Sequence, residues 1–233
     1  MISKDGGDHM RQQPGPSPEG GPVSLALFDF DGTLIPGDSI TDYLRYARKR
    51  GAASLGEFVR AARAAALYGC KRLSDADSKT VGLAFRKRHD QAYLDALDRD
   101  FVREILIPKF YQDGKNEMER RRKEGCRLLL VSASTENYMR FVAEALGVDA
   151  LLATPIEPDG SIQRNCKGEK KIGRIEGWLS ENGLTADFAS SYAYGDSKSD
   201  LPMLRLVGHP VQVNPKKALR KLAPEMETAA WKS

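Results

Sequence analysis

The sequence has few cysteines and no long apolar run. Its 233 residues include three cysteines, Cys70, Cys126 and Cys166, and no two of them form a Cys-x-x-Cys pair. This gives no support for a disulfide framework or a structural zinc site. No stretch approaches the roughly 18 to 20 consecutive apolar residues of a membrane-spanning helix, so we predict no integral membrane segment. Since no secretory signal pattern is visible, we expect a reducing compartment and a cytoplasmic location.

Composition and charge are those of an ordinary globular chain. Hydrophobic residues make up 41% and charged residues 29%, which suits a buried core, and the length suits one domain or one domain carrying a sizeable insertion. The net charge is +4, and residues 37–124 hold 20 Lys and Arg against 14 Asp and Glu. A basic segment suits an anionic partner, although it is also typical of solvated helix faces. Because no recognition motif accompanies it, we expect no nucleic-acid partner. The sequence predicts no oligomeric state.

Short apolar runs alternate with helical patterns over much of the chain. Runs with the length and content of buried strands lie at 23–29, 126–132, 150–153, 191–195 and 210–213. Helical patterns lie at 135–146, 171–179 and 198–206, each after one of these runs. The alternation predicts an α/β fold with a doubly wound, parallel, Rossmann-like sheet as its core.

Two segments fall outside that alternation. Residues 1–22 are rich in Gly, Pro, Ser and Gln and have almost no apolar side chains, so we predict a disordered tail. Residues 37–124 show helical patterns only, whereas an ordinary crossover between strands is much shorter. We therefore predict a helical cap domain at 37–124, inserted into an α/β core made of 23–36 and 125–233.

Two carboxylates follow the first predicted strand, in the run Asp29-Phe30-Asp31-Gly32-Thr33. Ligands of open α/β sheets bind at the carboxyl ends of the strands, so Asp29 and Asp31 can face one crevice. One could attack an electrophile while the other moves a proton, and a cation would offset their repulsion. The Thr33 hydroxyl could bind substrate in the same pocket. The same residues could also form an ordinary Asp-Gly turn.

Polar side chains also follow two later predicted strands. Asp196 and Asp200 lie one helical turn apart after the fourth strand, where they could complete a magnesium site with Asp29. Ser132 ends the second strand, where a hydroxyl and free amides at a helix start can bind an anion. Helix capping by Asp196, or by Ser134 and Thr135 beside Ser132, is the alternative interpretation.

Three lysines, Lys167, Lys170 and Lys171, precede the helical pattern at 171–179. Positive charge at a helix N-terminus opposes the helix dipole and invites a functional explanation, although surface lysines are common. Lys171 lies one turn before Ile175, at the edge of the apolar stripe that faces the sheet. Helical phase therefore favours Lys171 as the lysine that reaches the strand ends. Lys167 is the second choice and a candidate substrate contact.

These four features, in this order on successive strand ends, resemble the haloacid dehalogenase-like (HAD) hydrolase superfamily over residues 23–215. Asp29 to Thr33 is similar to its nucleophile loop and Ser132 to its second motif. Lys171 is similar to its third motif, and Gly195-Asp196-x-x-x-Asp200 to its fourth. The helical insertion resembles the cap of the phosphoserine-phosphatase-like subfamily IB. Lys167-Gly168-Glu169 is also similar to the third motif of phosphoserine phosphatases, which would make Lys167 the motif lysine.

The resemblance implies a phosphomonoester hydrolase acting on a small phosphorylated metabolite. Asp29 would attack phosphorus and form an aspartyl-phosphate. Asp31 would protonate the leaving oxygen and then activate the water that hydrolyses the intermediate. Ser132 and Lys171 would hold the phosphoryl oxygens.

The resemblance also implies Mg²⁺ as the cofactor. Asp29, the backbone carbonyl of Asp31, and Asp196 would hold the ion. Asp200 would orient a metal-bound water or Lys171.

The substrate is left open by the sequence. Phosphoserine phosphatases have Glu where this chain has Asp38, whose side chain is one methylene shorter. Asp38 could bind a substrate amine, as in phosphoserine or histidinol phosphate, or cap the next helix. The basic insertion would also suit a phospholipid headgroup.

The same residues bear on three other possible functions. A phosphotransferase would use the same site with an acceptor other than water. Asp31 and the acidic metal site disfavour a haloacid dehalogenase, which needs neither a second aspartate nor a metal. The intact set of motif residues disfavours a binding module without catalysis.

Overall fold

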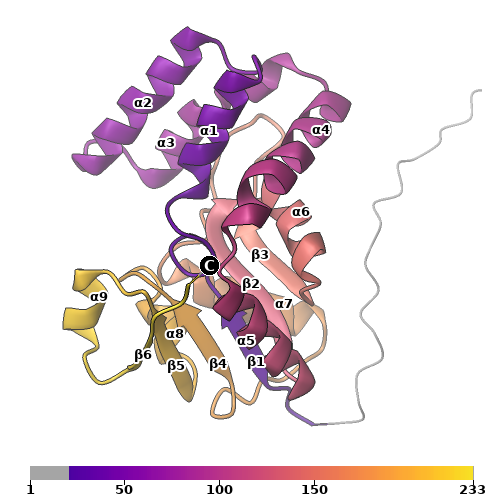
Figure 1. The fold of residues 1–233 in the computed structure, drawn as a ribbon, viewed down its shortest axis with the longest axis vertical. Coiled ribbons are helices and arrows are strands. Elements are labelled where there is room, and N and C mark those ends of the chain that lie inside the picture. The colour runs from indigo at the N-terminus through magenta and orange to yellow at the C-terminus, as the bar shows by residue number, and fades with distance from the viewer. Residues whose placement is uncertain (1–20, 233) are drawn as a thin grey trace, which may run out of the picture.

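A parallel sheet of six strands lies at the centre of the computed structural model, which describes residues 21–232 (Figure 1). The tail predicted at 1–22 therefore falls almost entirely outside the described residues. The strands are β1 (Leu25–Phe28), β2 (Arg127–Thr135), β3 (Ala150–Thr154), β4 (Tyr192–Gly195), β5 (His209–Val213) and β6 (Glu227–Ala229). Within the described residues, no helix has the length and apolar content needed to cross a membrane.

The order of the strands reverses at β1. The sheet runs β3-β2-β1-β4-β5-β6, and every neighbouring pair is parallel. The chain therefore adds β2 and β3 on one side of β1 and β4 to β6 on the other. Such a reversal leaves a crevice between the loops that follow the two strands flanking the switch point, here β1 and β4.

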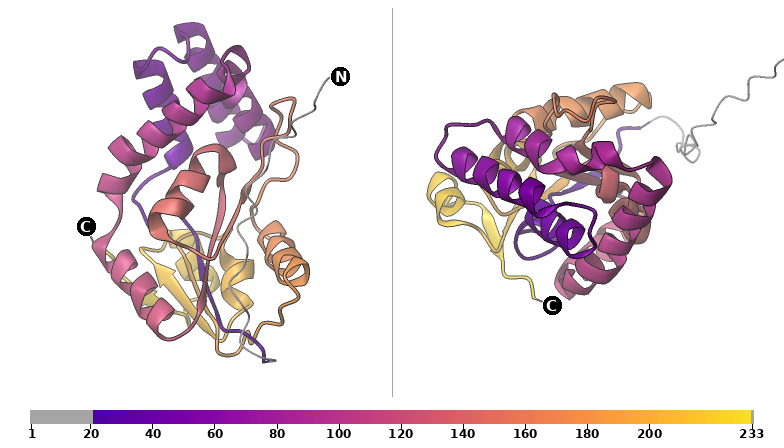
Figure 2. Two further views of the ribbon diagram at one scale, coloured as in Figure 1. Left: turned by 90° about the vertical axis from the view of Figure 1, so that its right-hand side faces the viewer. Right: turned by 90° about the horizontal axis from the view of Figure 1, so that it is seen from above.

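Alternate side chains of β1 face opposite layers of helices. Leu25 and Leu27 pack in a cluster with residues of α7, α8 and α9, whereas Ala26 and Phe28 pack with residues of α5 and α6. The helices are α5 (Gln112–Lys123), α6 (Glu136–Leu146), α7 (Lys170–Glu181), α8 (Leu201–Arg205) and α9 (Lys217–Leu222). Both faces of the sheet are covered (Figure 2), so the predicted doubly wound α/β fold is confirmed.

Four helices between β1 and β2 lie beyond the carboxyl ends of the strands (Figures 1 and 2). These cap helices are α1 (Ser39–Lys49), α2 (Leu55–Gly69), α3 (Asp75–Leu83) and α4 (Gln91–Phe101). Each is preceded by a side chain that accepts a hydrogen bond from the first helical turn: Asp38, Ser54, Ser74 and Asp90. These caps satisfy amides that a helix start leaves without partners.

The last helix of the predicted insertion, α5, packs on the sheet. Arg121 Nε donates to the Tyr194 hydroxyl of β4 over 2.8 Å. A Cβ at Gly114 would lie 3.1 Å from both Leu34 and Trp231. The division of the chain into domains stays a prediction, and this packing favours an insertion that ends before residue 112.

Two short elements were not predicted. The strand β6 has three residues, two of them exposed, and it pairs only at the edge of the sheet. The helix α9 has six residues and buries Leu219 alone. Neither is long enough to show a hydrophobic period in the sequence.

The cap helices are joined to the sheet layer by buried rings. Tyr43 of α1 and Phe101 of α4 pack on Tyr138 of α6, with ring centroids 5.2 and 5.3 Å apart. Beside them the buried Asp98 accepts hydrogen bonds from Asn137 Nδ2 at 2.9 Å and from Arg86 at 2.8 Å. This aromatic junction, Tyr43, Phe101 and Tyr138, fixes one side of the cap helices together with the contacts of Asp98.

Truncating the junction should destabilise the protein. We expect Phe101→Ala to lower the free energy of unfolding by about 3–5 kcal/mol, because Phe101 is fully buried. Urea unfolding followed by circular dichroism measures the change. Tyr93→Ala is the matched control, since Tyr93 lies on the same helix and is 39% exposed. Equal losses in the two variants would contradict the assignment.

Candidate active site

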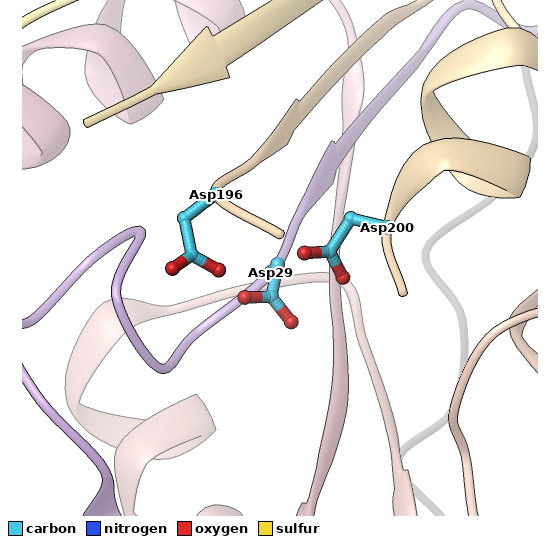
Figure 3. A group of neighbouring side chains, drawn as sticks. All are labelled: Asp29, Asp196 and Asp200. Atoms are coloured by element: carbon cyan, nitrogen blue, oxygen red, sulfur yellow. The ribbon is translucent and has the colours of Figure 1, made fainter. Parts of the chain in front are cut away.

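Three aspartates converge where the sheet order reverses (Figure 3). Asp29 directly follows β1, Asp196 directly follows β4, and Asp200 directly precedes α8. One carboxylate oxygen from each lies within 4.8 Å of the others, and all three residues are buried. The parallel sheet therefore gathers residues that are up to 171 positions apart in the sequence.

Gly32 makes room for this cluster. Its φ of +85° is in the left-handed region, and a Cβ at this position would lie 2.2 Å from Asp196 Oδ2. A side chain would therefore be strained by the backbone angle and would also collide with a carboxylate. This explains why a glycine follows the two aspartates, beyond what an ordinary turn requires.

Lys171 bridges two of the aspartates from the start of α7. Its Nζ donates to Asp29 Oδ1 at 2.6 Å and to Asp200 Oδ1 at 2.7 Å, and the residue is only 1% exposed. Burial alone would lower the pKa of Lys171, but the charges of Asp200 and Asp29 outweigh it and raise the pKa. The ammonium therefore stays charged inside the protein.

Lys167 lies elsewhere on the cavity surface. Its Nζ donates to the Tyr68 hydroxyl at 2.7 Å and to Asp75 Oδ1 at 3.4 Å, both on the cap-helix side. Of the two lysines between which the sequence left a choice, Lys171 is therefore the one that contacts the aspartate cluster.

The carboxyl groups beside Lys171 respond differently to burial. Burial, together with the charge of Asp200, raises the pKa of Asp29 to about 7. Burial also favours the neutral form of Asp200, but Lys171 outweighs it and lowers the pKa of that carboxyl. Thr33 Oγ1 donates to Asp29 Oδ2 at 3.2 Å, and Thr33 does not line the cavity in front of Asp29. Its hydroxyl therefore orients Asp29, in place of the predicted contact with substrate.

Asp31 lies apart from the three-aspartate cluster. Its carboxylate accepts the backbone N–H of Ser39 at 2.6 Å, the Ser39 hydroxyl at 3.1 Å and the hydroxyl of Ser134. Burial, followed by the charge of Asp38, raises the pKa of Asp31 to about 6. A carboxyl group that titrates near neutrality is suited to give and take back a proton.

Ser132 and Ser134 lie near the end of β2, where its pairing register with β3 shifts. Ser132 is buried, and its Oγ accepts the N–H of Ser134 at 3.0 Å, which leaves its own hydrogen for an oxygen in the cavity. Of the two predicted helix caps, Thr135 is the N-cap residue of α6, but its side chain makes no capping hydrogen bond, and Ser134 does not cap the helix. β2 instead continues to Thr135, and Ser134 faces Asp31.

Sequence reasoning missed Ser39, Ser134 as an active-site residue, and Lys216. Lys216 follows β5, and its Nζ lies 2.6 Å from Asp196 Oδ2 although the side chain is 63% exposed. Burial raises the pKa of Asp196, and Lys216 opposes that rise. A lysine soon after a predicted strand was the available signal for Lys216. Ser39 carried none, because it reaches Asp31 only through the start of α1.

A cavity of about 280 Å³ joins these residues to the cap helices. Its sheet side includes Asp29, Asp31, Ser132, Lys171, Asp196 and Asp200. Its cap side includes Asp38, Ile40, Leu44, Ala61, Ala65, Tyr68 and Lys79. Asp38 is also the N-cap of α1, since its Oδ1 accepts the Thr41 N–H at 2.9 Å. Both interpretations of Asp38 therefore remain compatible with its position.

The carboxylate cluster fits a hard divalent cation. Oxygen donors are the ligands that Mg²⁺ prefers, and the exposed ammonium of Lys216 already sits on Asp196 as a cation. Both oxygens of Asp200 are engaged, one by Lys171 and the other by the N–H and hydroxyl of Ser197. Asp29 Oδ1 is also engaged by Lys171, but Asp29 Oδ2 accepts only a longer 3.2 Å bond from Thr33 among the described residues. Asp29 and Asp196 are therefore better placed as direct ligands than Asp200.

Comparison with known proteins agrees with this arrangement. Residues 26–205 match the model of the haloacid dehalogenase-like hydrolases, a segment that contains the three aspartates, Asp31, Ser132 and Lys171 but ends before Lys216. The chain belongs to the HAD-like hydrolase family.

Several relatives of this HAD-like hydrolase extend over most of its length. A histidinol-phosphatase of Neisseria meningitidis is 34% identical over 215 residues, which are 87% of this chain and 95% of that protein. A phosphoserine phosphatase of Mycobacterium tuberculosis is 30% identical over 214 residues, which are 87% of this chain and 68% of that protein.

Solved structures share the fold. A Bordetella pertussis protein of unknown function superposes with a TM-score of 0.83 at 29% identity, over 90% of this chain and 99% of that one. A phospho-aspartyl intermediate analogue of phosphoserine phosphatase superposes with a TM-score of 0.56 at 18% identity, over 89% of this chain and 100% of that one.

Removing the lysine that pairs with Asp196 should strengthen metal binding. We expect Lys216→Met to lower the dissociation constant for Mg²⁺ about fivefold, because an exposed charge at this distance opposes a cation by about 1 kcal/mol. Isothermal titration calorimetry measures the constant. Lys217→Met removes an exposed charge one residue away and should leave it unchanged. Weaker Mg²⁺ binding by Lys216→Met would show that Lys216 supports the ligand instead of competing with Mg²⁺.

Proposed function

We propose that this protein is a magnesium-dependent phosphomonoester hydrolase that works through an aspartyl-phosphate on Asp29. The observation that carries the proposal is the buried Lys171, which holds Asp29 beside Asp200, while Asp31 lies apart and is held by Ser39 and Ser134. One carboxylate is thereby suited to be a nucleophile and the other a proton carrier. The phosphatase names of the two curated relatives support the same class.

In the first step, Asp29 attacks phosphorus and the ester oxygen leaves. Lys171 and the Ser132 hydroxyl face the cavity and would hold phosphoryl oxygens, which neutralises and orients the transferred group. Asp31 in its protonated form gives its proton to the leaving oxygen. Ser39 and Ser134 hold the Asp31 carboxyl in place for this transfer.

In the second step, the ionised Asp31 takes a proton from water, which attacks phosphorus and releases Asp29. Asp29, the Asp31 carbonyl and Asp196 would hold Mg²⁺, and Asp200 would keep Lys171 in position. The bound ion would supply positive charge against the carboxylates and the phosphoryl oxygens.

The substrate we propose is a small phosphate ester that carries an amine. Asp38 lies on the cap side of the cavity, and among the described residues only Thr41 hydrogen-bonds to its carboxylate. Nearby, Ile40, Leu44, Ala61 and Ala65 form an apolar surface. Histidinol phosphate, the substrate class named for the Neisseria relative, has an amine and no carboxylate. Phosphoserine would bring a carboxylate to this apolar surface, so it is the second candidate.

Two substitutions test the proposed roles of the carboxylates with p-nitrophenyl phosphate. We expect Asp29→Asn to abolish turnover without unfolding the protein, because an amide does not attack phosphorus. Asp31→Asn should still release nitrophenol in a burst equal to the enzyme concentration, since nitrophenolate leaves without a proton. Steady turnover should then fall about 10²–10⁴-fold, because the water lacks its base.

The wild-type protein supplies the control for this experiment. Its turnover should require Mg²⁺ and stop with EDTA. Turnover retained by Asp29→Asn would contradict the nucleophile assignment. Transfer of the phosphoryl group to an added alcohol in preference to water would identify a phosphotransferase instead.

Asp38 should affect amine-bearing substrates selectively. We expect Asp38→Asn to raise the KM for histidinol phosphate about tenfold, because a lost charge-assisted hydrogen bond is worth about 1.5–3 kcal/mol. The KM for p-nitrophenyl phosphate, which has no amine, should stay within about twofold. Steady-state kinetics on both substrates measures the difference. An unchanged KM for both substrates would show that Asp38 acts only as the helix cap, since Asn caps a helix as well as Asp.

A further inference from the structure

Lys79 is a nearly buried charged residue that the proposed mechanism does not use. It lies on α3, one of the cap helices, lines the cavity and is 9% exposed. Its Nζ donates to Asp75 Oδ2 at 2.6 Å, to the Ala133 carbonyl at 2.8 Å and to Asn165 Oδ1 at 3.0 Å. An ammonium has three hydrogens, so each has an acceptor within the protein. Lys79 therefore has no donor left for a phosphoryl oxygen.

The contact with Ala133 lies in the middle of the Ser132–Ser134 segment. The pairing register of β2 and β3 shifts between Val131 and Thr135, so this stretch has left the regular ladder. Its backbone must find other partners there. The Ala133 carbonyl accepts from Lys79 of the cap helices and from Thr154 Oγ1 of β3, at 2.8 Å each. These two donors fix the peptide that sets the direction of both serine hydroxyls.

The remaining partners of Lys79 connect the cap helices to the loop before α7. Asp75 accepts from Lys79, Asn165 Nδ2 and Lys167, and Lys167 also donates to the Tyr68 hydroxyl of α2. The Lys79 network, comprising Asp75, Lys79, Asn165 and Lys167, thus joins α2 and α3 to the segment that leads into Lys171. It consists of charged and polar groups alone, whereas the attachment on the other side of the cap helices combines packed rings with the buried contacts of Asp98.

We propose that Lys79 is a positioning residue through which the cap helices complete the phosphate-binding segment Ser132–Ser134. The inference rests on the proposed function, since it assumes that Ser132 binds the phosphoryl group. When α3 is seated on the sheet layer, Lys79 holds the Ala133 carbonyl and the serine hydroxyls are aimed. A substrate that contacts the cap side of the cavity favours that seating and thereby improves its own phosphate site.

Phosphate binding tests the inference without turnover. The probe is inorganic phosphate in saturating Mg²⁺, titrated by calorimetry. We expect Lys79→Met to weaken phosphate binding about tenfold or more, with the Mg²⁺ dissociation constant within about twofold of wild type. Lys87→Met, an exposed lysine in the same insertion, is the matched control and should change neither constant.

Repeating the measurement in the Ser132→Ala variant distinguishes positioning of the serine segment from a general loss of stability. If Lys79 acts through the serine segment, Lys79→Met should weaken phosphate binding by less than about twofold when Ser132→Ala is already present. The same loss in both backgrounds, or no loss in wild type, overturns the inference. Asp75→Asn keeps the shape of the side chain but removes the charge that pairs with Lys79, so it should also weaken phosphate binding. This variant replaces Lys79→Met if Lys79→Met does not fold. An unchanged phosphate dissociation constant in Asp75→Asn would overturn the inference.

Failure of the inference about Lys79 and failure of the proposed function give different results. Absence of Mg²⁺-dependent turnover in the folded wild-type protein would remove the proposed function. Normal turnover together with unchanged phosphate binding in the Lys79 and Asp75 variants would remove only the role of Lys79.

Discussion

The buried ammonium of Lys171 is the interaction on which the site depends. Taking a charge out of water is costly, and the cost is offset only where partners of opposite charge are held at hydrogen-bond distance. Asp29 and Asp200 meet that condition from two different elements, the end of β1 and the start of α8. Their own mutual repulsion is relieved in turn by Lys171. Removing Lys171 would leave two neighbouring buried carboxylates without compensation, whereas removing one aspartate would leave the ammonium paired with the other.

The consequences of a parallel sheet could be predicted from the sequence. Buried strands have recognisable apolar runs, and their carboxyl ends share one edge, so the sequence predicts that Asp29, Ser132 and Asp196 lie at the same edge of the sheet. The helical phase of Lys171 was equally informative, because Ile175 marks the side of α7 that packs inward. Each of these predictions depends on a single strand or helix and on which way it faces relative to the sheet.

What could not be predicted depends on how separate elements dock. Ser39 reaches Asp31 because α1 begins beside the nucleophile loop, and Lys79 reaches Ala133 because α3 rests over the end of β2. Neither spacing nor periodicity encodes these distances. The end of the insertion was hard to predict for a related reason, since α5 is helical like the cap helices but packs on the sheet. A helical pattern in the sequence predicts a helix, but it does not predict whether that helix packs on the sheet or belongs to the cap helices.

The two attachments of the cap helices differ in how they would respond to water. Separating the aromatic junction would expose buried ring surface to water and break the buried hydrogen bond between Asn137 and Asp98, so this side is expected to stay closed. The Lys79 network consists of groups whose hydrogen bonds water can replace at a modest net cost. Opening would therefore begin on the side of α2 and α3, and it would withdraw Lys79 from the Ala133 carbonyl and leave Thr154 as its donor. The physical difference between the two attachments thus links access to the cavity with assembly of the phosphate-binding segment.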